Sequence, residues 1–455
     1  MYLCTFSHFR QFLIFIPVGI LAMLYGCAVG WTSVGIVGLQ QPDSKVPLEK
    51  SDTKLIAAFF ELGRFSSAIP AGLLGDRWGR KTIILICSVQ HLLAWSLIIL
   101  TESINALFLA RFLSGLAVGT GNAVLFIYAG EMSPPRIRGT ILSLMYTCYY
   151  LGILIEYIFG ACLTYELVAI CSLAVCSLFF VFIFFIKESP SYLLTKSKDD
   201  KAKSIYKWLN NRRPEDEVNK EFEAIKEYVN NQNKNKESSV SGFSDPVNRK
   251  CVSLVFIINF LTQLTGLPVL IAFVHTVFKS STNLTANQFG VIFGALQYIA
   301  GCSATLLSDK IGRRKMYKLT CISCAFCHAV TAILFFIDRD LGYEVPFMSW
   351  YLLISISLYA CIYAAGLGPL TVIVRGELLP QAVKGIGSGL AVVSAGVSCF
   401  LLVFIFHFIQ DTFGITYNFV FFFFVSIALA LLTHFKLPET KHKTLAEIQE
   451  AFRNS

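Results

Sequence analysis

Long runs of apolar residues recur along the chain, and they limit its possible folds more than any other feature. A helix that crosses a bilayer needs roughly 20 mostly apolar residues, because lipid offers the backbone no hydrogen-bond partners. By this criterion the chain contains about twelve spans. Of its 455 residues 55% are hydrophobic and only 15% are charged, which excludes a soluble globular protein. We therefore predict an all-α membrane protein with twelve transmembrane helices. Their centres are expected near Leu24, Phe65, Leu92, Leu116, Gly152, Leu178, Leu261, Gln297, Phe326, Tyr359, Leu401 and Val425.

One polar stretch, residues 187–250, divides the apolar runs into six and six. We predict an N-terminal six-helix half (1–186), a cytoplasmic loop with short helices (187–250), a C-terminal six-helix half (251–435) and a tail (436–455). Within the loop, Pro214 and three acidic residues predict a helix start, and residues 218, 222, 225 and 229 form one apolar stripe. We expect these short helices to lie against the bundle. The first apolar run (12–39) is too long for a signal peptide, so we predict that it is retained.

Lysine and arginine collect in the loops on one side of the predicted bundle, and such loops face the cytoplasm. Both termini are therefore predicted to be cytoplasmic. The sequon at Asn283 then falls in an exterior loop, where it can be glycosylated. The net charge of +9 follows from this topology, so no nucleic-acid partner is predicted. Most of the 14 cysteines lie in apolar runs and predict no disulfide framework.

Three loop motifs occur twice, in the same order. Residues 130–139 (GEMSPPRIRG) match 376–385 (GELLPQAVKG), residues 75–81 (GDRWGRK) match 308–315 (SDKIGRRK), and the ESP at 188–190 matches the PET at 438–440. Each pair lies in equivalent loops of the two halves, which indicates tandem duplication of a six-helix unit. Because six is even, the two repeats have the same orientation and are parallel.

These motifs resemble those of the major facilitator superfamily, and specifically of its sugar porter family. Further matches are residues 188–194 (ESPSYLL), 366–369 (GLGP) and 438–445 (PETKHKTL). The resemblance covers nearly the whole chain. It implies an alternating-access transporter for a small neutral carbohydrate, trehalose or a hexose, that works as a facilitative uniporter and a monomer in the plasma membrane. It implies no cofactor.

The repeated decapeptides carry charges that predict a gate. We expect Glu131 to pair with Lys384, and Glu377 with Arg138, across the seam between the halves. Such contacts form only when the halves close on the cytoplasmic side, so they would hold one of two states. The alternative is that these charges only fix topology. The predicted gating residues are Asp76, Arg77, Gly79, Arg80, Glu131, Arg138, Glu188, Asp309, Gly312, Arg313, Arg314, Glu377, Lys384 and Glu439.

The central site is predicted from the family's seventh-span motif, Gln-Gln-x-x-Gly-Ile-Asn, which corresponds to residues 262–268 (TQLTGLP). Gln263 matches the second glutamine, but Pro268 replaces the asparagine. Val372 stands where the family has a tryptophan, and residues 395–396 (AG) replace an Asn-Trp pair. These changes remove several of the side chains that bind the sugar in the family. The predicted substrate-binding residues are Gln263, Gln297, Tyr146, Tyr363, Thr262 and Thr32, and for each glutamine an interhelical hydrogen bond is the alternative.

Proton coupling is not predicted through the first span, because Thr32 replaces the aspartate of proton-coupled relatives. Glu61 and Arg64 are three residues apart on one helix and are expected to pair. Glu156 has no partner near it in sequence. It is our candidate for a coupling group, and the alternative is that it lies near enough to the exterior to be hydrated.

Two other functions are weighed against a transporter. A non-transporting sugar sensor of the same fold would be expected to carry a longer tail. Cys321, Cys324 and His328 share a helix face, but they lie in an apolar run with no further ligands nearby, so no metal site is predicted. No catalytic motif is present, and an enzyme is not predicted.

Overall fold

The structure is a computed structural model, and it describes most of the chain. The described residues are 9–41, 44–46, 48–133, 138–210, 214–234, 245–278, 285–308, 312–343, 346–379 and 383–438. Almost all of them lie in helices, and this part of the chain contains no β-strand.

The N-terminal half is built from long helices. They are α1 (Phe9–Leu39), α2 (Lys50–Trp78), α3 (Arg80–Leu100), α4 (Ile104–Met132), α5 (Arg138–Cys162) and α6 (Tyr165–Phe182), followed by the short turn η2 (Ile183–Phe185). α2 begins with a local cap, in which the Asp52 carboxylate accepts a hydrogen bond from the Glu49 amide at 2.9 Å.

The C-terminal half has interruptions in its seventh and tenth spans. The helices are α10 (Pro246–Leu264), α11 (Leu267–Phe278), α12 (Ala286–Ser308), α13 (Arg313–Phe335), η5 (Phe336–Asp340), α14 (Met348–Ile362), η6 (Tyr363–Leu367), α15 (Gly368–Leu378), α16 (Lys384–Thr412) and α17 (Ile415–Lys436). The seventh span breaks at Gly266, whose φ is +108°. A Cβ there would lie 2.7 Å from the ring of Phe422, so both the backbone and the neighbouring ring favour glycine.

Ten helical segments of the described chain are long and apolar enough to cross a membrane. α2 and α12 complete the predicted twelve. α2 is less apolar than the others because charged residues occur at both of its ends and at Glu61 and Arg64 in its middle. Large apolar side chains remain exposed on the outside of the bundle, such as Phe184 (83%) and Leu100 (77%), as expected for a surface in lipid. The predicted fold class is confirmed.

Glycines let the helices of the N-terminal half approach closely. A Cβ on Gly152 of α5 would lie 1.9 Å from the carbonyl oxygen of Met23 on α1. A Cβ on Gly115 of α4 would lie 2.0 Å from the carbonyl oxygen of Phe60 on α2. In a membrane, helices associate mainly through such close packing, so these contacts hold α1 to α5 and α2 to α4.

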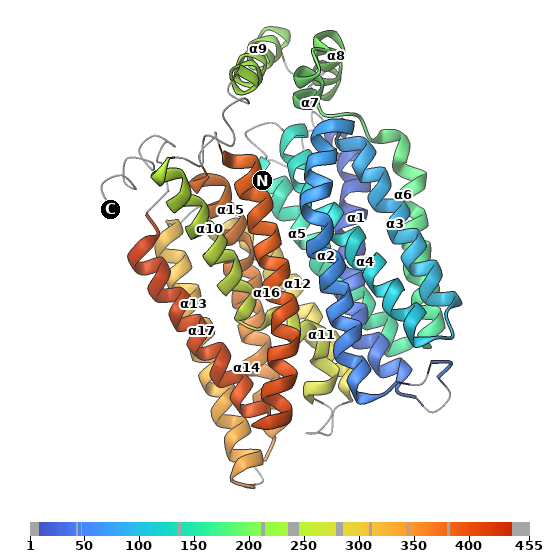
Figure 1. The fold of residues 1–455 in the computed structure, drawn as a ribbon, viewed down its shortest axis with the longest axis vertical. Helices are drawn as coiled ribbons and strands as arrows, with labels where there is room; N and C mark the ends of the chain where they lie inside the picture. Colours follow the sequence, from blue (N-terminus) through green and yellow to red (C-terminus); the bar gives the residue numbers. More distant parts are fainter. Residues whose placement is uncertain are drawn as a thin grey trace.

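The two halves lie side by side, with α1–α6 on one side and α10–α17 on the other (Figure 1). α5 packs against α12, α2 against α16, and α1 against α11. These contacts, with a smaller one between α4 and α16, form the seam between the halves in the part of the chain that the structure describes.

The loop helices lie beyond one end of the bundle (Figure 1). They are α7 (Pro190–Thr195), α8 (Asp199–Leu209) and α9 (Glu215–Lys234), and α7 contacts α4 while α8 contacts α1. The predicted stripe is confirmed, since Val218, Phe222 and Val229 are buried with Leu193 and Tyr206 in a small apolar cluster of their own. We call this end of the bundle the α7–α9 end and the other the opposite end.

Candidate functional site: a cavity between the two halves

A cavity lies on the seam and is lined by both halves. It encloses about 1350 Å³ of empty space, including its open part. The N-terminal half contributes residues of α1 to α5, and the C-terminal half residues of α10, α11, η6, α15 and α16. A space lined from both repeats changes shape when one repeat moves against the other, which suits alternating access.

Three of the predicted substrate-binding residues line this cavity. They are Gln263 of α10, Tyr146 of α5 and Tyr363 of η6. The Gln263 side chain is held by Cys399, whose thiol lies 3.5 Å from its Oε1, and the Tyr146 ring packs against Phe126 with the centroids 5.2 Å apart. The two halves therefore present an amide and two phenols to one space.

Thr262, predicted beside Gln263, is not part of the cavity wall. Its hydroxyl donates to the Ile258 carbonyl at 2.7 Å and lies 2.8 Å from the Tyr317 hydroxyl, which in turn lies 2.8 Å from the hydroxyl of Thr371. Thr371 does line the cavity. Consecutive residues on a helix point about 100° apart, and here Gln263 faces the cavity while Thr262 is directed toward Tyr317. Thr262 instead supports the wall from behind.

Gln297 of α12 is fully buried, and it too lies outside the cavity wall. It is three residues after Gly294 and four before Gly301, whose Cα atoms face Tyr157 and Tyr150 of α5. Residues at this spacing share a helix face, so Gln297 faces the seam. Neither its Nε2 nor its Oε1 has a hydrogen-bond partner among the described residues. A buried amide in this state calls for a water or a ligand group.

Thr32 also lies behind the wall, where it holds Arg111 of α4. The Arg111 guanidinium donates to the Thr32 hydroxyl at 2.6 Å and to the Ala28 carbonyl at 3.1 Å. It also lies over the rings of Trp31 and Phe60, at 4.9 and 4.5 Å. Arg111 is thus a buried cation that is stabilised by oxygen acceptors, by aromatic faces and by the carboxylates of Glu61 and Glu156.

Glu156 of α5 is fully buried, so the alternative that it is hydrated near the exterior is wrong. Its Oε2 accepts a hydrogen bond from the Ser172 hydroxyl at 2.8 Å, and the Cys27 thiol also interacts with the carboxyl. Glu156 lies close enough to Arg111 for the two to interact electrostatically. Neighbouring helices surround this carboxyl, because α5 packs closely on α1 through Gly26, Gly30 and Gly152.

The predicted pairing of Glu61 with Arg64 is confirmed, with a separation of 2.7 Å between the charged groups. Both residues line the cavity, which the sequence did not reveal. Arg64 also donates to the Tyr25 hydroxyl at 3.2 Å and to the Ala395 carbonyl of the other half at 3.4 Å. The family's Trp position next to it, Gly396, leaves room for Phe65, because a Cβ on Gly396 would lie 2.4 Å from the Phe65 Cβ. A phenylalanine of the other half therefore fills the space beside the glycine.

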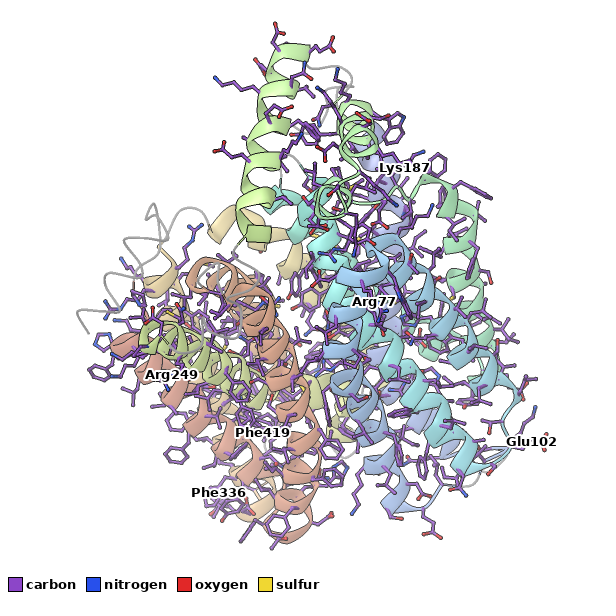
Figure 2. The ribbon with its side chains drawn as sticks, turned by 45° about the horizontal axis from the view of Figure 1, so that its top comes forward. Arg77, Glu102, Lys187, Arg249, Phe336 and Phe419 are labelled. Atoms are coloured by element: carbon purple, nitrogen blue, oxygen red, sulfur yellow. The ribbon has the colours of Figure 1, made fainter. Side chains whose placement is uncertain are left out.

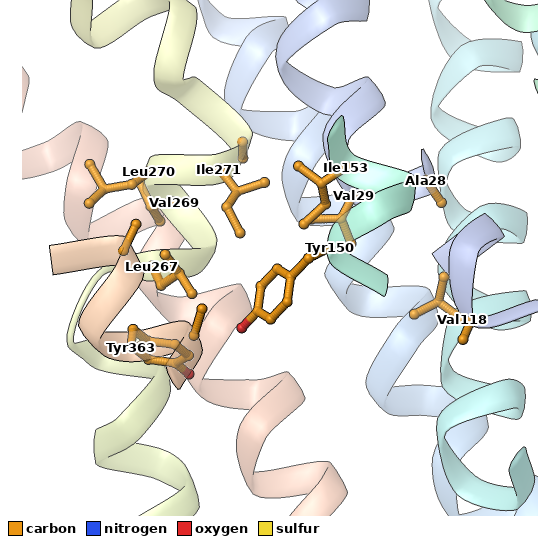
Figure 3. Packing of buried hydrophobic residues seen from close by; sticks show 14 of the residues in the cluster. Ala28, Val29, Val118, Tyr150, Ile153, Leu267, Val269, Leu270, Ile271 and Tyr363 are labelled. Carbon is orange, nitrogen blue, oxygen red and sulfur yellow. The ribbon is translucent and has the colours of Figure 1, made fainter. Parts of the chain in front are cut away.

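Tyr150 closes part of the cavity from the N-terminal half. Its ring extends from α5 toward Leu267 and Tyr363 of the C-terminal half (Figure 3). Tyr146, Tyr149 and Tyr150 all line the cavity. Their spacing of three and four residues places them on one helix face, and that spacing is the sequence signal that could have identified Tyr149 and Tyr150.

At the α7–α9 end, Arg80 organises the predicted gating residues of the N-terminal half. Its guanidinium pairs with Asp76 at 2.7 Å and with Glu131 at 3.3 Å. The Glu188 carboxylate accepts hydrogen bonds from the backbone amides of Arg80, at 2.9 Å, and Lys81, at 3.2 Å, and so caps the start of α3. In this conformation Glu131 is thus paired within its own half.

The remaining gating residues are less fully described. The Arg77 carbonyl accepts a hydrogen bond from the Tyr192 hydroxyl at 3.0 Å, Gly312 precedes α13, and Arg314 donates to the His434 carbonyl. Asp309, Glu439 and the sequon at Asn283 lie outside the described residues, as do the side chains of Arg138, Glu377 and Lys384. The predicted pairs across the seam therefore stay predictions.

The cysteine-rich face of α13 packs as part of the helix bundle. The ring of His328 lies 4.1 Å from that of Tyr359 and 5.5 Å from that of Phe422, measured between centroids. The described part of the chain contains no group of three or more His, Cys, Asp or Glu side chains that could hold a metal ion.

Comparison with known proteins places the chain in a family. The sequence profile of the family described as "Sugar (and other) transporter" matches residues 18–452. The chain belongs to this family. It is a sugar transporter of the major facilitator superfamily and not an enzyme, as the motifs predicted.

Curated relatives and a solved structure are similar over nearly their whole length. The mouse "Solute carrier family 2, facilitated glucose transporter member 6" is 27% identical over 94% of this chain and 88% of the relative. The "Facilitated trehalose transporter Tret1" of Polypedilum vanderplanki is 26% identical over 97% of this chain and 88% of the relative. The structure of the proton:xylose symporter XylE matches with a TM-score of 0.79 at 18% identity, covering 97% of this chain and all of that one, and it supports the fold.

Proposed function

We propose that the protein is a facilitative uniporter of a small carbohydrate, a hexose or trehalose, in the plasma membrane, with the α7–α9 end in the cytoplasm. The observation that carries the proposal is the cavity on the seam, whose wall combines amide and phenol groups of both halves. Amides bind sugar hydroxyls through paired hydrogen bonds, and aromatic faces pack against a sugar ring. The similarity to proteins named as facilitated glucose and trehalose transporters supports the choice of substrate.

The shape of the seam supports a conformation that is open toward the cytoplasm. Polar contacts join the halves at the opposite end, where the Tyr157 hydroxyl donates to the Ile271 carbonyl at 2.8 Å and the Asn287 amide to the Gly160 carbonyl at 3.4 Å. The cavity reaches toward the α7–α9 end as far as Arg375, three residues before the end of α15. Closing that end in the outward-open state would bring the predicted pairs Glu131–Lys384 and Glu377–Arg138 together.

The test is uptake of labelled glucose and trehalose into liposomes that contain the purified protein, with and without an imposed proton gradient. A uniporter gives saturable uptake that the gradient does not change. Replacing Gln263 with alanine is expected to raise KM about tenfold, because an amide hydrogen bond to the sugar is lost. Gln288→Ala, at an exposed glutamine of α12, is the matched control and should leave KM unchanged.

Absence of flux with retained sugar binding would instead identify a non-transporting sensor.

Exchange of the two charges Glu377 and Arg138 tests the predicted gate. If the single changes Glu377→Arg and Arg138→Glu leave uptake as in the wild type, the predicted gate is wrong. If each change lowers uptake and the exchange of both restores it, the pairing is supported.

A second candidate is proton-coupled symport through Glu156. The observation that favours it is a fully buried carboxyl that interacts with the Ser172 hydroxyl, the Cys27 thiol and the Arg111 guanidinium. In such a site, proton release would be coupled to a change in packing around the carboxyl. Uptake driven by a proton gradient in the wild type, and independent of it in Glu156→Gln, would establish coupling. Uptake that ignores both the gradient and the substitution would exclude it.

A further inference from the structure

Among the side chains that the structure describes, those of the cavity wall carry more positive than negative charge. Its acidic and basic side chains, apart from one histidine, are Glu61, Arg64 and Arg375. Glu61 and Arg64 form an ion pair at 2.7 Å, so their charges offset each other. Arg375 is half-buried and has no ion pair with any side chain that the structure describes. One guanidinium charge therefore remains available to a ligand in the cavity.

Arg375 is directed into the cavity by its place on α15. It is four residues after Thr371 and seven after Gly368, and all three residues line the cavity, so this face of α15 forms the wall. Across the seam, Tyr146 of α5 lines the same cavity, so Arg375 shares this space with a phenol of the N-terminal half. An arginine in the last turn of a helix also interacts favourably with the helix dipole, but that interaction does not require the side chain to face a cavity.

The rest of the wall offers neutral hydrogen-bonding groups. Asn259 and Gln263 of α10 supply amides, and Tyr363 of η6 supplies a phenol. Gly368 begins α15 directly after η6, and seven residues of α-helix separate Arg375 from it by about 10 Å. A ligand with hydroxyls at one end and an anionic group at the other would be able to contact both the neutral amides and phenol and the Arg375 guanidinium. A planar carboxylate matches a guanidinium particularly well, because it accepts two parallel hydrogen bonds.

We propose that the cavity binds a monosaccharide that carries a carboxylate, a sugar acid, with the carboxylate on Arg375 and the hydroxyls on the amides of α10. This inference rests on the proposed function, since it assigns a substrate class to the same cavity. The two proposals differ in the charge of the substrate. The neutral groups of the wall accept any small sugar, and Arg375 adds selectivity for an anionic one. An anion carried alone also moves charge across the membrane, whereas a neutral sugar does not.

The experiment compares labelled D-glucuronate with labelled D-glucose in liposomes that contain the purified full-length protein. The wild type should take up glucuronate saturably, and a potassium diffusion potential that is positive inside should accelerate uptake of glucuronate but not of glucose. The Arg375→Met variant keeps the length of the side chain and removes its charge. It should lower the ratio of kcat/KM for glucuronate to that for glucose by about tenfold or more, as expected when a charge-assisted hydrogen-bonded pair is lost.

Two further variants control for folding and for charge. Arg375→Lys keeps the charge but loses the two-pronged geometry, so its ratio should lie between those of the wild type and Arg375→Met. Arg249→Met removes an equal charge from an exposed site near the start of α10 (Figure 2), outside the cavity wall, and should leave the ratio unchanged. If Arg375→Met does not fold, the lysine variant and the effect of the diffusion potential on the wild type still decide the question.

The outcomes separate the inference from the proposed function. Glucose uptake without any uptake of, or competition by, glucuronate would overturn the inference and leave the uniporter proposal intact. Glucuronate uptake with the same ratio in Arg375→Met would also overturn it. If neither sugar moves, the transport proposal fails, and thermal stabilisation of the detergent-solubilised protein by glucuronate then tests the inference alone. Stabilisation that is lost in Arg375→Met supports it, and its absence in the wild type overturns it.

Discussion

Gly79, at the turn between α2 and α3, has a φ of +102°, which side chains with a Cβ rarely adopt. A Cβ there would also lie 2.2 Å from the Glu188 carboxylate that caps α3. We expect Gly79→Ala to lower the free energy of unfolding by roughly 1–3 kcal/mol, because it strains the backbone and displaces the cap. Thermal unfolding in detergent measures the effect. Gly72→Ala is the control: Gly72 lies within α2, a Cβ there would have nothing within 4 Å, and the change should be neutral or stabilising.

The pair of Glu61 and Arg64 gives a second prediction at this scale. Arg64→Gln leaves the Glu61 carboxylate largely buried without its cation, and it should destabilise the protein by about 3–5 kcal/mol. The double change Glu61→Gln and Arg64→Gln removes both charges and should recover most of that loss. The free energies of unfolding of the two single variants and of the double variant are measured, and together they give the coupling between the two charges. Additive losses would show that the two charges do not stabilise each other.

Spacing along a helix predicted the pairing of Glu61 and Arg64, but not their exposure to the cavity. Sequence shows which residues share a face, whereas the direction of that face depends on how the helix packs. The same reason explains why the motif predicts Thr262 beside Gln263 in the site although the structure puts it behind the wall. Arg375 was missed entirely, because it lies between the GLGP motif at 366–369 and the repeated decapeptide, in neither of which it takes part.

Among the elements, α8 and α9 are joined by ion pairs at their surface. The pKa of Glu215 is lowered from 4.5, first by its hydrogen bond from Lys207, and the pKa of Lys226 is raised from 10.5, first by its hydrogen bond to Asp199. A lowered carboxyl pKa stabilises the folded form above 4.5, and this contribution is lost as the pH falls through the folded pKa. A raised ammonium pKa stabilises it below 10.5, and this contribution is lost as the pH rises through the folded pKa.

We therefore expect the protection of α9 from hydrogen exchange to be constant between pH 4.5 and 10.5 and to fall on either side. Protection is measured as the ratio of the intrinsic to the observed exchange rate, which removes the pH dependence of the chemistry. The change should be small, since both pairs are exposed to solvent. A variant with Lys207→Met and Lys226→Met should lose the pH dependence. A change in the protection of α9 near neutral pH in the wild type would contradict the attribution of the pH dependence to these two ion pairs.

Hydropathy predicted where the spans lie, but it did not predict their interruptions. The seventh and tenth spans were expected as single helices, and the structure breaks them at Gly266 and at η6. Neither break changes the apolar composition of its span, so a pattern based on hydropathy cannot register it. The glycine of the seventh-span motif and the GLGP motif of the tenth were the available signals.

For the whole molecule, the contact between Tyr157 and Ile271 joins the two halves at the opposite end. Tyr157→Phe removes this hydrogen bond, worth about 1 kcal/mol, and should shift the population about fivefold toward states that are open there. The distance between labels at Glu102 and Phe336, one on each half at this end (Figure 2), reports the opening. The labels are introduced as non-natural amino acids because the chain contains 14 cysteines.

Tyr317→Phe is the matched control. It removes a buried phenol that bonds only to residues of its own half in the described contacts, Thr262 and Thr371. It should change stability without changing the distance between the labels. Equal distance distributions for Tyr157→Phe and the wild type would show that this hydrogen bond does not hold the end closed.

The duplication in the sequence predicted two parallel six-helix repeats, but it could not predict how they meet. Glu131 pairs with Arg80 of its own half in this conformation, although the motif equally allows a partner across the seam. At a surface, an ion pair within one half and an ion pair across the seam differ little in energy. Which partner Glu131 takes therefore depends on the conformation of the whole transporter.

The wide π turn of η6 affects the direction in which the side chains of α15, the next helix of the span, point. Such a turn holds one residue more than an α turn, and one residue corresponds to about 100° of rotation about the helix axis. If η6 were to tighten into an ordinary α turn, α15 would have to rotate by that angle or shift along its axis. Arg375 would then swing out of the wall and a neighbouring aliphatic side chain would take its place. In that case the five residues Tyr363–Leu367 would determine whether the face of α15 in the cavity carries a cation or an aliphatic side chain.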